Sequence, residues 1–163
     1  MTNAKSQARL ALRGIETRND AAYQRMLPWT KLAFAIGGTQ AAIATANADA
    51  ATLWQMVPVA AAAVILPHHP VEYVYNHGLR FVTKTAPLPA NKAPVRFAFF
   101  MATLILAAAA LAFDSGNTWL GYALGGQVAI VSAIFVASSF CIPAAVWAVV
   151  TGNGHKVTCA LSA

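Results

Sequence analysis

Three of the chain's four histidines lie in one polar stretch, LPHHPVEYVYNHGLRF, which runs from Leu66 to Phe81. A transition metal requires several ligands at fixed geometry, whereas a haem iron or a chlorophyll-type pigment requires one axial imidazole. His68 and His69 are adjacent and cannot point the same way from one helix face. We therefore expect His68, His69 and His77 to lie hydrogen-bonded or solvated at a membrane boundary, with no metal site and no cofactor required. Axial ligation of haem or a chlorophyll-type pigment by one of them is the alternative.

Cys141 is the candidate thiol and lies in the apolar sequence SSFCIPAAVW, whereas Cys159 lies near the end of the chain. Apolar surroundings raise the pKa of a thiol and make it unreactive, so we expect a structural role for Cys141 and keep sulfur handling as an alternative. The sequence contains none of the motifs of nucleophilic hydrolases, zinc proteases, phosphate-binding loops or dinucleotide-binding folds. We predict no catalytic residue and no enzymatic activity.

Four apolar segments must position these side chains. Of the 163 residues, 58% are hydrophobic and 10% are charged, whereas a soluble domain carries about 25% charged residues. A bilayer core about 30 Å thick requires about 20 apolar helical residues. We therefore predict an all-α integral membrane protein whose four transmembrane helices form two hairpins. The predicted crossings are residues 29–48, 51–66, 97–113 and 119–150, and the last is long enough to tilt, to kink near Pro143 or to protrude.

Basic residues are confined to the N-terminal segment, the middle loop and the C-terminal tail, whereas the turns near Asp49 and Asp114 contain none. The positive-inside rule therefore predicts a multi-pass protein of the inner (cytoplasmic) membrane with both termini and the middle loop in the cytoplasm. The net charge of +6 then indicates anionic lipids as partners and not nucleic acid. The basic residues are Lys5, Arg9, Arg13, Arg18, Arg25, Lys31, Arg80, Lys84, Lys92, Arg96 and Lys156.

The middle loop contains a predicted amphipathic helix of about 14 residues that begins at Pro70 and lies on the cytoplasmic interface. Glu72 suits the first turn, and a proline-rich connector, TAPLPANKAP, follows the helix. The predicted regions are a basic arm (1–27), the first hairpin (28–66), the cytoplasmic loop (67–95), the second hairpin (96–150) and a tail (151–163). The expected apolar stripe is Val71, Val74, Tyr75 and Val82, and the expected polar stripe is Glu72, Asn76 and Arg80.

Small and polar residues within the crossings are candidates for helix packing, because lipid removes the hydrophobic drive between helices and favours close backbone contact. We expect Gln40 and Gln127 to form interhelical hydrogen bonds. The two halves also resemble each other at a spacing of 65 residues, which relates Asp49 to Asp114 and Trp54 to Trp119. A shared need for basic inner ends and interfacial tryptophans explains the same pattern without a duplication. The candidate packing or partner residues are Gln40, Gln127, Gly37, Gly125, Arg80 and Arg96.

The sequences KAPVRFAFFMA (92–102) and SSFCIPAAVW (138–147) resemble a family of small bacterial four-helix membrane proteins, domain of unknown function 4395. The family's A-P-x-x-R-F-A pattern is matched by Ala93, Pro94, Arg96, Phe97 and Ala98. In its F-x-x-C-x-x-C motif, Cys141 takes the first thiol position and Ala144 stands at the second. The resemblance implies four crossings and a membrane location but no established activity, and the missing second thiol removes the dithiol.

The hypothesis from these features is a non-catalytic accessory or structural subunit of a larger bacterial membrane complex. Its helices would pack beside other membrane subunits, and the arm and middle-loop helix would dock on the cytoplasmic face. The alternatives are a pigment- or haem-associated subunit that uses a histidine of residues 68–77, and a sulfur-handling membrane protein that uses Cys141.

Overall fold

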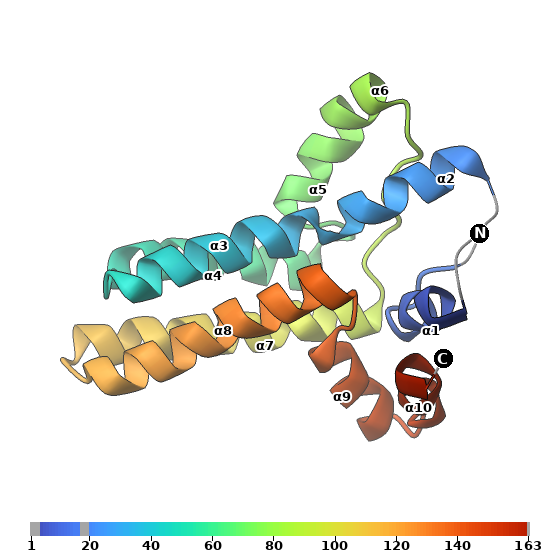
Figure 1. The fold of residues 1–163 in the computed structure, drawn as a ribbon. Helices are drawn as coiled ribbons and strands as arrows, with labels where there is room; N and C mark the ends of the chain where they lie inside the picture. The colour runs from blue at the N-terminus through green and yellow to red at the C-terminus, as the bar shows by residue number, and fades with distance from the viewer. Residues whose placement is uncertain (1–3, 17–19, 163) are drawn as a thin grey trace.

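The computed structural model describes residues 4–16 and 20–162, so Arg18 of the basic arm lies outside the described part. The described residues are helical with no strand, which confirms the all-α prediction (Figure 1). Besides the α-helices there is a 3-10 turn, η1, and a π-helical segment, η2. The elements are α1 (Ala4–Leu12), α2 (Ala21–Met26), η1 (Leu27–Lys31), α3 (Leu32–Ala46), α4 (Ala50–Ile65), α5 (Pro70–Val74), η2 (Tyr75–Leu79), α6 (Arg80–Thr83), α7 (Ala93–Asp114), α8 (Thr118–Ser138), α9 (Ile142–Val150) and α10 (His155–Ser162).

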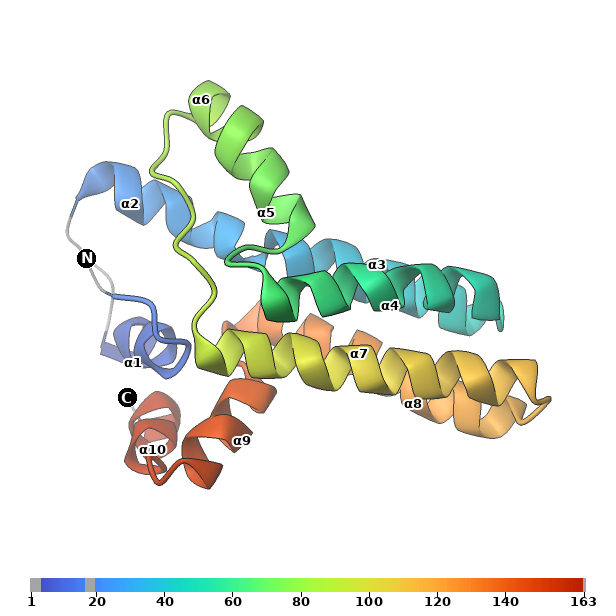
Figure 2. The ribbon, with the colours of Figure 1, turned by 180° about the vertical axis from the view of Figure 1, so that it is seen from behind.

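Two helical hairpins, α3–α4 and α7–α8, lie side by side with their tight turns at the same end (Figures 1 and 2). We call this the turn end, and the opposite end, where both described chain ends lie, the basic end. The hairpins pack crosswise, because α3 contacts α8 extensively and α4 contacts α7, while α3 and α4 contact each other less. Two hairpins related by an approximate two-fold axis along the bundle would pack in this way.

The two tight turns have the same hydrogen bonds at a spacing of 68 residues. The Asn47, Ala48 and Asp49 amides donate to carbonyls in α3, and the Ser115, Gly116 and Asn117 amides donate to the carbonyls 68 positions after those. Asp49 then caps α4 and Asn117 caps α8, each by accepting an amide three residues later. The two turns therefore share one hydrogen-bond pattern, in which Asp49 corresponds to Asn117 and not to Asp114, the residue that a spacing of 65 relates to it.

Two helices of the described residues, α7 with 22 residues and α8 with 21, are long and apolar enough to cross a membrane. A third span results if α4 and the helix that follows it are taken together across a 70° bend. The predicted first crossing contains only 15 α-helical residues in α3, preceded by the 3-10 turn η1. The structure therefore supports a membrane protein with two or three such helices, fewer than the four predicted crossings.

The predicted amphipathic helix is present as a continuous helical segment from Pro70 to Thr83, made of α5, η2 and α6. Pro70 begins it, because its missing amide is not needed in a first turn, and Glu72 completes a capping box with His69. The two predicted stripes are each interrupted at one residue. Glu72 of the polar stripe and Tyr75 of the apolar stripe are buried, at 5% and 0% exposure, because the helix packs on the bundle through them, whereas Val74 and Val82 of the apolar stripe are 66% and 83% exposed.

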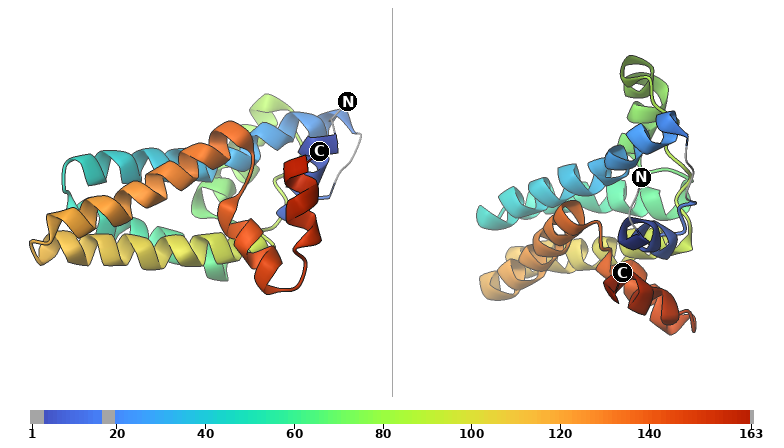
Figure 3. Two further views of the ribbon diagram at one scale, coloured as in Figure 1. Left: turned by 60° about the horizontal axis from the view of Figure 1, so that its bottom comes forward. Right: turned by 45° about the vertical axis from the view of Figure 1, so that its right-hand side comes forward.

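The long fourth apolar segment is two helices with a break between them. Ser139 has a left-handed backbone (φ +62°) that ends α8, and Cys141 is the N-cap of α9. Pro143 lies in the first turn of α9, so the break falls within four residues of the predicted kink. Each hairpin thus leads into a new helix at the basic end, α5 after the first hairpin and α9 after the second (Figure 3).

The N-terminal arm folds back onto the chain. Helix α1 packs against α10, so the two ends of the described chain lie side by side (Figure 3). Leu12 joins a buried cluster with Phe135 and Ala160, and Met26 is fully buried in another cluster with Tyr75. Burial of these apolar side chains ties the arm to the basic end of the bundle.

Glycines allow the crosswise helix pairs to approach closely. A Cβ added to Gly38 on α3 would lie 2.5 Å from the Ser132 Cβ on α8, and one added to Gly125 would lie 2.1 Å from the Thr45 Oγ1. Nothing lies within 4 Å of a Cβ added to Gly37. Gly125 therefore has the packing role expected of it, whereas Gly38 and not the predicted Gly37 makes the close contact on α3.

Candidate functional site

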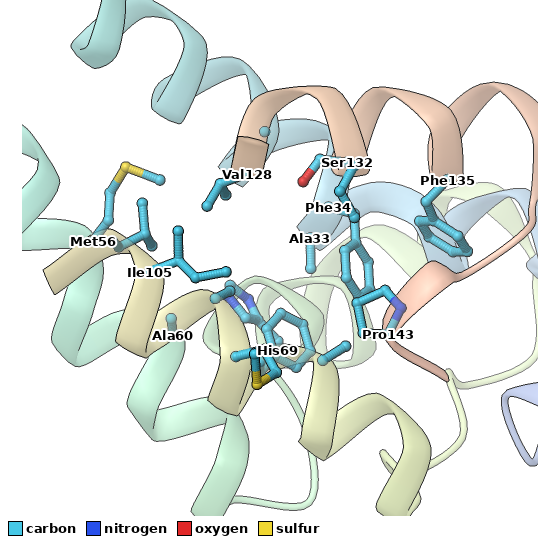
Figure 4. Close-up of a pocket in the computed structure, with 18 of the residues that line it drawn as sticks. Ala33, Phe34, Met56, Ala60, His69, Ile105, Val128, Ser132, Phe135 and Pro143 are labelled. Carbon is cyan, nitrogen blue, oxygen red and sulfur yellow. The ribbon is translucent and has the colours of Figure 1, made fainter. Parts of the chain in front are cut away.

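A cavity of about 450 Å³ lies between the two hairpins and is walled by α3, α4, α7 and α8, with α5 and α9 at the basic end. Most of its wall is apolar, and Met56, Ile105 and Val128 come from three different helices (Figure 4). The polar groups on the wall are few and include the His69 imidazole and the Cys141 thiol. An apolar cavity with a small number of polar groups is the usual form of a small-molecule site.

His69 is the N-cap of the helix that follows α4, and its ring points into the cavity (Figure 4). Its Nδ1 accepts the Val71 amide at 3.2 Å, and its backbone amide donates to the Glu72 carboxylate at 2.8 Å. An accepting Nδ1 places the proton of the neutral ring on Nε2. Burial lowers the pKa of His69 to about 4, so the ring is neutral at physiological pH and Nε2–H is a hydrogen-bond donor.

Cys141 occupies the corresponding place in the second half, as the N-cap of the helix that follows α8. Its side chain is 2% exposed and packs with Phe135 and Ala144. Burial raises the pKa of this thiol, although the Ala144 amide and the charge of Arg13 oppose the rise. The group is therefore a protonated thiol at neutral pH, as a structural cysteine would be, but it lies on the cavity wall.

Aromatic rings form the basic end of the cavity. The Phe34 ring stacks on Phe99 with 4.9 Å between centroids and meets the edge of Phe135 at 4.7 Å. The His69 ring also stacks on the Phe99 ring, with 5.1 Å between centroids. All four rings line the cavity. The Phe99 ring and the Val71 amide together orient the imidazole and hence its Nε2–H.

Behind these rings lies a buried polar layer that joins the arm to the bundle. The Arg13 guanidinium donates to the Thr30 hydroxyl at 3.0 Å and to the Thr30 carbonyl at 3.2 Å, and lies 4.6 Å from the centre of the Phe135 ring. Glu72 accepts from the Asn91 amide group at 3.0 Å as well as from the His69 amide. Burial lowers the pKa of Arg13 and raises the pKa of Glu72, and the opposite charge of each opposes the other's shift.

Two further basic residues bind the C-terminal end of α8. Lys31 Nζ donates to the Val136 carbonyl at 2.7 Å, and Arg9 donates to the Ser138 carbonyl. The last carbonyls of a helix lack intrahelical partners and carry partial negative charge, so cations stabilise them. Arg9 of the arm and Lys31 of η1 therefore hold the C-terminal end of α8 just before its break with α9.

The three predicted histidines do not form one site. His69 reaches the cavity, whereas the His68 ring lies edge-on to Tyr73 at 5.4 Å and the exposed His77 contacts the Tyr73 carbonyl through Nδ1 at 2.9 Å. Within residues 4–16 and 20–162, no group of three His, Cys, Asp or Glu side chains is arranged to hold a metal ion. Only His69 of the three histidines is therefore placed to bind a molecule in the cavity.

The predicted packing residues have mixed placements. Gln40 and Gln127 line the cavity, but neither side chain hydrogen-bonds to another helix within the described residues, so the expected interhelical bonds are not formed. The Arg96 Nε donates to the Asn91 carbonyl at 3.0 Å, and the Arg80 guanidinium lies 4.4 Å from the centre of the Phe81 ring. Arg96, in the first turn of α7, thus contacts the connector that precedes the helix, and Arg80 contacts the next residue of its own helix.

Sequence reasoning missed Arg13 and Glu72 as buried groups. Arg13 comes directly after α1, whose Leu10 and Leu12 are buried. Two leucines at the end of an otherwise polar segment were the sign in the sequence that the arm has a buried side. Glu72 follows His69 at the spacing of a capping box, and the box was the only local sign that its carboxylate turns inward. The cavity itself leaves no pattern in the sequence, because it depends on how four helices are rotated.

The family model described as Domain of unknown function (DUF4395) matches residues 25–151, which include both hairpins, His69 and Cys141. The match confirms the family resemblance drawn from residues 92–102 and 138–147. No curated protein and no solved structure matches the chain.

Proposed function

The chain belongs to the family described as a domain of unknown function (DUF4395), and we propose that it binds a small, predominantly apolar molecule between its two hairpins. The observation that carries this proposal is the cavity of about 450 Å³, because small-molecule sites usually measure roughly 300–1,000 Å³. The aromatic rings at its basic end and the aliphatic side chains of α4, α7 and α8 would contact the body of the molecule. His69 and Cys141 would contact its polar part.

In this proposal all four hairpin helices cross the inner membrane, with the basic end in the cytoplasm. The distribution of Lys and Arg supports that orientation, because the turn end contains neither. Helix 70–83 and α9 would then lie along the cytoplasmic interface, with exposed Val74, Phe81, Val82, Val149 and Val150 towards the acyl chains. An apolar ligand would enter from the bilayer. A haem or chlorophyll-type pigment is one such ligand. Axial ligation by His69 Nε2 would need its lone pair, so the ring proton would have to move to Nδ1 and the hydrogen bond from the Val71 amide would be lost.

The experiment is purification in lipid nanodiscs from a bacterial membrane, followed by mass spectrometry of extracted small molecules and an absorption spectrum. Ala102, which lines the cavity, is changed to Phe to fill it, and the exposed Ala108 of the same helix is changed to Phe as the matched control. We expect a molecule that co-purifies with the wild type and the Ala108→Phe variant and is lost from the Ala102→Phe variant. Equal recovery from both variants, or none from the wild type, would contradict the proposal, and a Soret or chlorophyll-type band would identify a tetrapyrrole.

The second candidate is the accessory subunit of a larger membrane complex. The observation that favours it is the exposed apolar surface on helices that project from the bundle at the basic end, including Val82 at 83% and Val150 at 76%. Such patches occur at interfaces with other proteins as well as with lipid. Purification in a mild detergent with identification of co-purifying proteins tests this role. A chain that migrates alone as a monodisperse small protein would exclude it.

A further inference from the structure

We propose that the cavity opens to the lipid between α3 and α4, and that Gln40 and Gln55, one on each side of this opening, bind the polar group of a ligand as it enters. The inference rests on the proposed binding function and on the proposed membrane orientation. It adds a route of entry and a ligand class, which is an apolar molecule that carries a carbonyl or hydroxyl group.

The first hairpin is the loosest side of the cavity wall. Helices α3 and α4 contact each other less than α3 contacts α8, α8 contacts α7 or α7 contacts α4. In the second hairpin a Cβ added to Gly121 would lie 2.6 Å from the Phe113 ring, so α7 and α8 approach closely. In the first hairpin Gly37 lines the cavity, and nothing lies within 4 Å of its added Cβ. We therefore place the opening of the cavity between α3 and α4.

Residues that line a cavity and are also exposed mark its rim. The exposed residues of the cavity wall are Ile36 and Gln40 on α3, Gln55 and Val59 on α4, Gln127 on α8 and Val146 on α9. The two residues on α3 are four apart, as are the two on α4, so each pair lies on one face of its helix. No residue of α7 that lines the cavity is exposed. The first hairpin thus supplies two edges of a rim, and α7 supplies none.

The tight turn sets these two edges opposite each other. Gln40 lies eight residues before Ala48 of the turn and Gln55 seven after it, while Ile36 and Val59 lie twelve before and eleven after. At 1.5 Å per residue, the two glutamines share one level roughly 10–12 Å from the turn, and Ile36 and Val59 share another at roughly 17–18 Å. The opening therefore has a carboxamide on each side near the turn end and an aliphatic side chain on each side farther in.

The two carboxamides suit the passage of a polar group through the hydrocarbon layer. At roughly 10–12 Å from the turn they would lie inside a bilayer core about 30 Å thick. Within the described residues, neither the Gln40 nor the Gln55 side chain makes a hydrogen bond. An unpaired carboxamide and an unpaired ligand carbonyl are both unfavourable in apolar surroundings, so a hydrogen bond between them lowers both costs. Because this contact forms at the rim, it should speed entry and exit alike.

The experiment measures how fast reagents in the lipid reach a thiol inside the cavity. The reporter is Ala102→Cys, on the cavity wall, in a chain that also carries Cys141→Ala and Cys159→Ser and is held in nanodiscs. Two neutral reagents share a benzyl body: N-benzylmaleimide has two carbonyls, and benzyl bromide has neither carbonyl nor hydroxyl. Mass spectrometry gives each alkylation rate, which is divided by the rate of the same reagent with free cysteine.

Bulk at the rim tests the position of the opening. Gln40→Trp and, separately, Gln55→Trp should slow both reagents about tenfold, as expected for a steric cost at a narrow passage. The matched controls are Ala108→Trp and Ala123→Trp. These alanines are exposed, lie 68 positions later in the second hairpin and do not line the cavity. Both controls should leave the two rates unchanged.

Removal of the carboxamides tests their chemistry. The double variant Gln40→Met/Gln55→Met keeps the length of each side chain and removes its hydrogen-bonding groups. It should slow N-benzylmaleimide about tenfold, as expected for one hydrogen bond in apolar surroundings, and leave the benzyl bromide rate unchanged. Circular dichroism melts confirm that each variant is folded. If the double variant does not fold, each single methionine variant should lower the maleimide rate relative to the bromide rate.

The failures are distinguishable. Equal rates in the tryptophan variants of the glutamines and of the alanines overturn the opening between α3 and α4 and leave cavity binding intact, because the reporter is still reached. A charged, membrane-impermeant methanethiosulfonate that modifies the reporter as readily as N-benzylmaleimide overturns an opening to lipid. An unchanged maleimide rate in a folded methionine variant overturns the role of the carboxamides alone. A reporter thiol that no reagent modifies overturns both the opening and the proposed binding function.

Discussion

Changing Gly38 to Ala tests whether the crosswise contact between α3 and α8 holds the hairpins together. The added Cβ would lie 2.5 Å from the Ser132 Cβ, whereas carbon atoms in contact are normally about 3.5–4.0 Å apart. The obstructing atom is next to the backbone of α8 and cannot rotate away, so the two helices must separate. Overpacking of this kind costs about 1–3 kcal/mol.

The neighbouring Gly37 is the matched control, because nothing lies within 4 Å of its added Cβ. Both substitutions gain the same helix propensity, about 0.5–1 kcal/mol for Gly to Ala, so their difference isolates the overlap. Gly38→Ala should therefore unfold below Gly37→Ala by about 2–4 °C for each kcal/mol of overlap, as measured by far-ultraviolet circular dichroism in one detergent. Adding Ser132→Gly should recover the part of the midpoint lost to the overlap, less the part that a glycine inside α8 costs. Equal midpoints for the two alanine variants would refute the packing of α3 on α8.

Three further predictions concern the polar groups. The pKa of His69 is about 4 in the folded chain, below its ordinary value of 6.5, so the unfolded chain binds the proton more readily. The free energy of unfolding should therefore fall as the pH drops from about 6.5 to 4, by about 3 kcal/mol in all. The His69→Asn variant should lack this part of the acid destabilisation, and equal pH slopes of the two melting curves would contradict it. Trp54→Phe removes the hydrogen bond that the indole N–H donates to the Asp114 carboxylate of the other hairpin at 2.8 Å, and should lower the free energy of unfolding by about 0.5–1.5 kcal/mol. Trp119→Phe, at an 80% exposed site, should leave the thermal midpoint unchanged in the same measurement. Arg13→Lys cannot make both Thr30 contacts, so it should lower the free energy of unfolding by about 1–3 kcal/mol and make the arm more sensitive to limited proteolysis. Arg25→Lys, at an exposed site, is the control, and equal digestion rates of the two variants would contradict the role of Arg13.

The parts of the fold that were predictable from the sequence are those with local signals. The apolar segments become helices, and helix 70–83 begins at Pro70 because a proline, a preceding N-cap and an acid two positions later all favour the same start. The break after α8 was expected near Pro143 for the same reason. Each signal acts within one turn of helix and needs no knowledge of the neighbours.

The parts that were not predictable depend on helix rotation. Gly37 and Gly38 are adjacent and chemically identical, yet only Gly38 faces α8. The polar stripe expected on helix 70–83 contains Glu72, which is buried because the capping box and the Asn91 side chain satisfy its carboxylate. When a helix is apolar on all its faces, as membrane helices are, its sequence does not indicate which face is buried against another helix. Arg13 was missed because its ring and hydroxyl partners are distant in the sequence.

The two polar groups of the candidate site hold the same position at the start of a helix but make different contacts. Each hairpin ends in a break that contains a proline in the first turn of the next helix, and the residue at each N-cap lines the cavity. His69 caps its own helix through Nδ1 and turns Nε2–H towards the cavity, whereas the Cys141 thiol interacts with the Ala144 amide in the first turn of α9. One half therefore presents an imidazole N–H to the cavity and the other presents a protonated thiol. Because the two groups differ, the polar part of a bound molecule would bind each half differently, and the His69 and Cys141 variants should change binding to different extents.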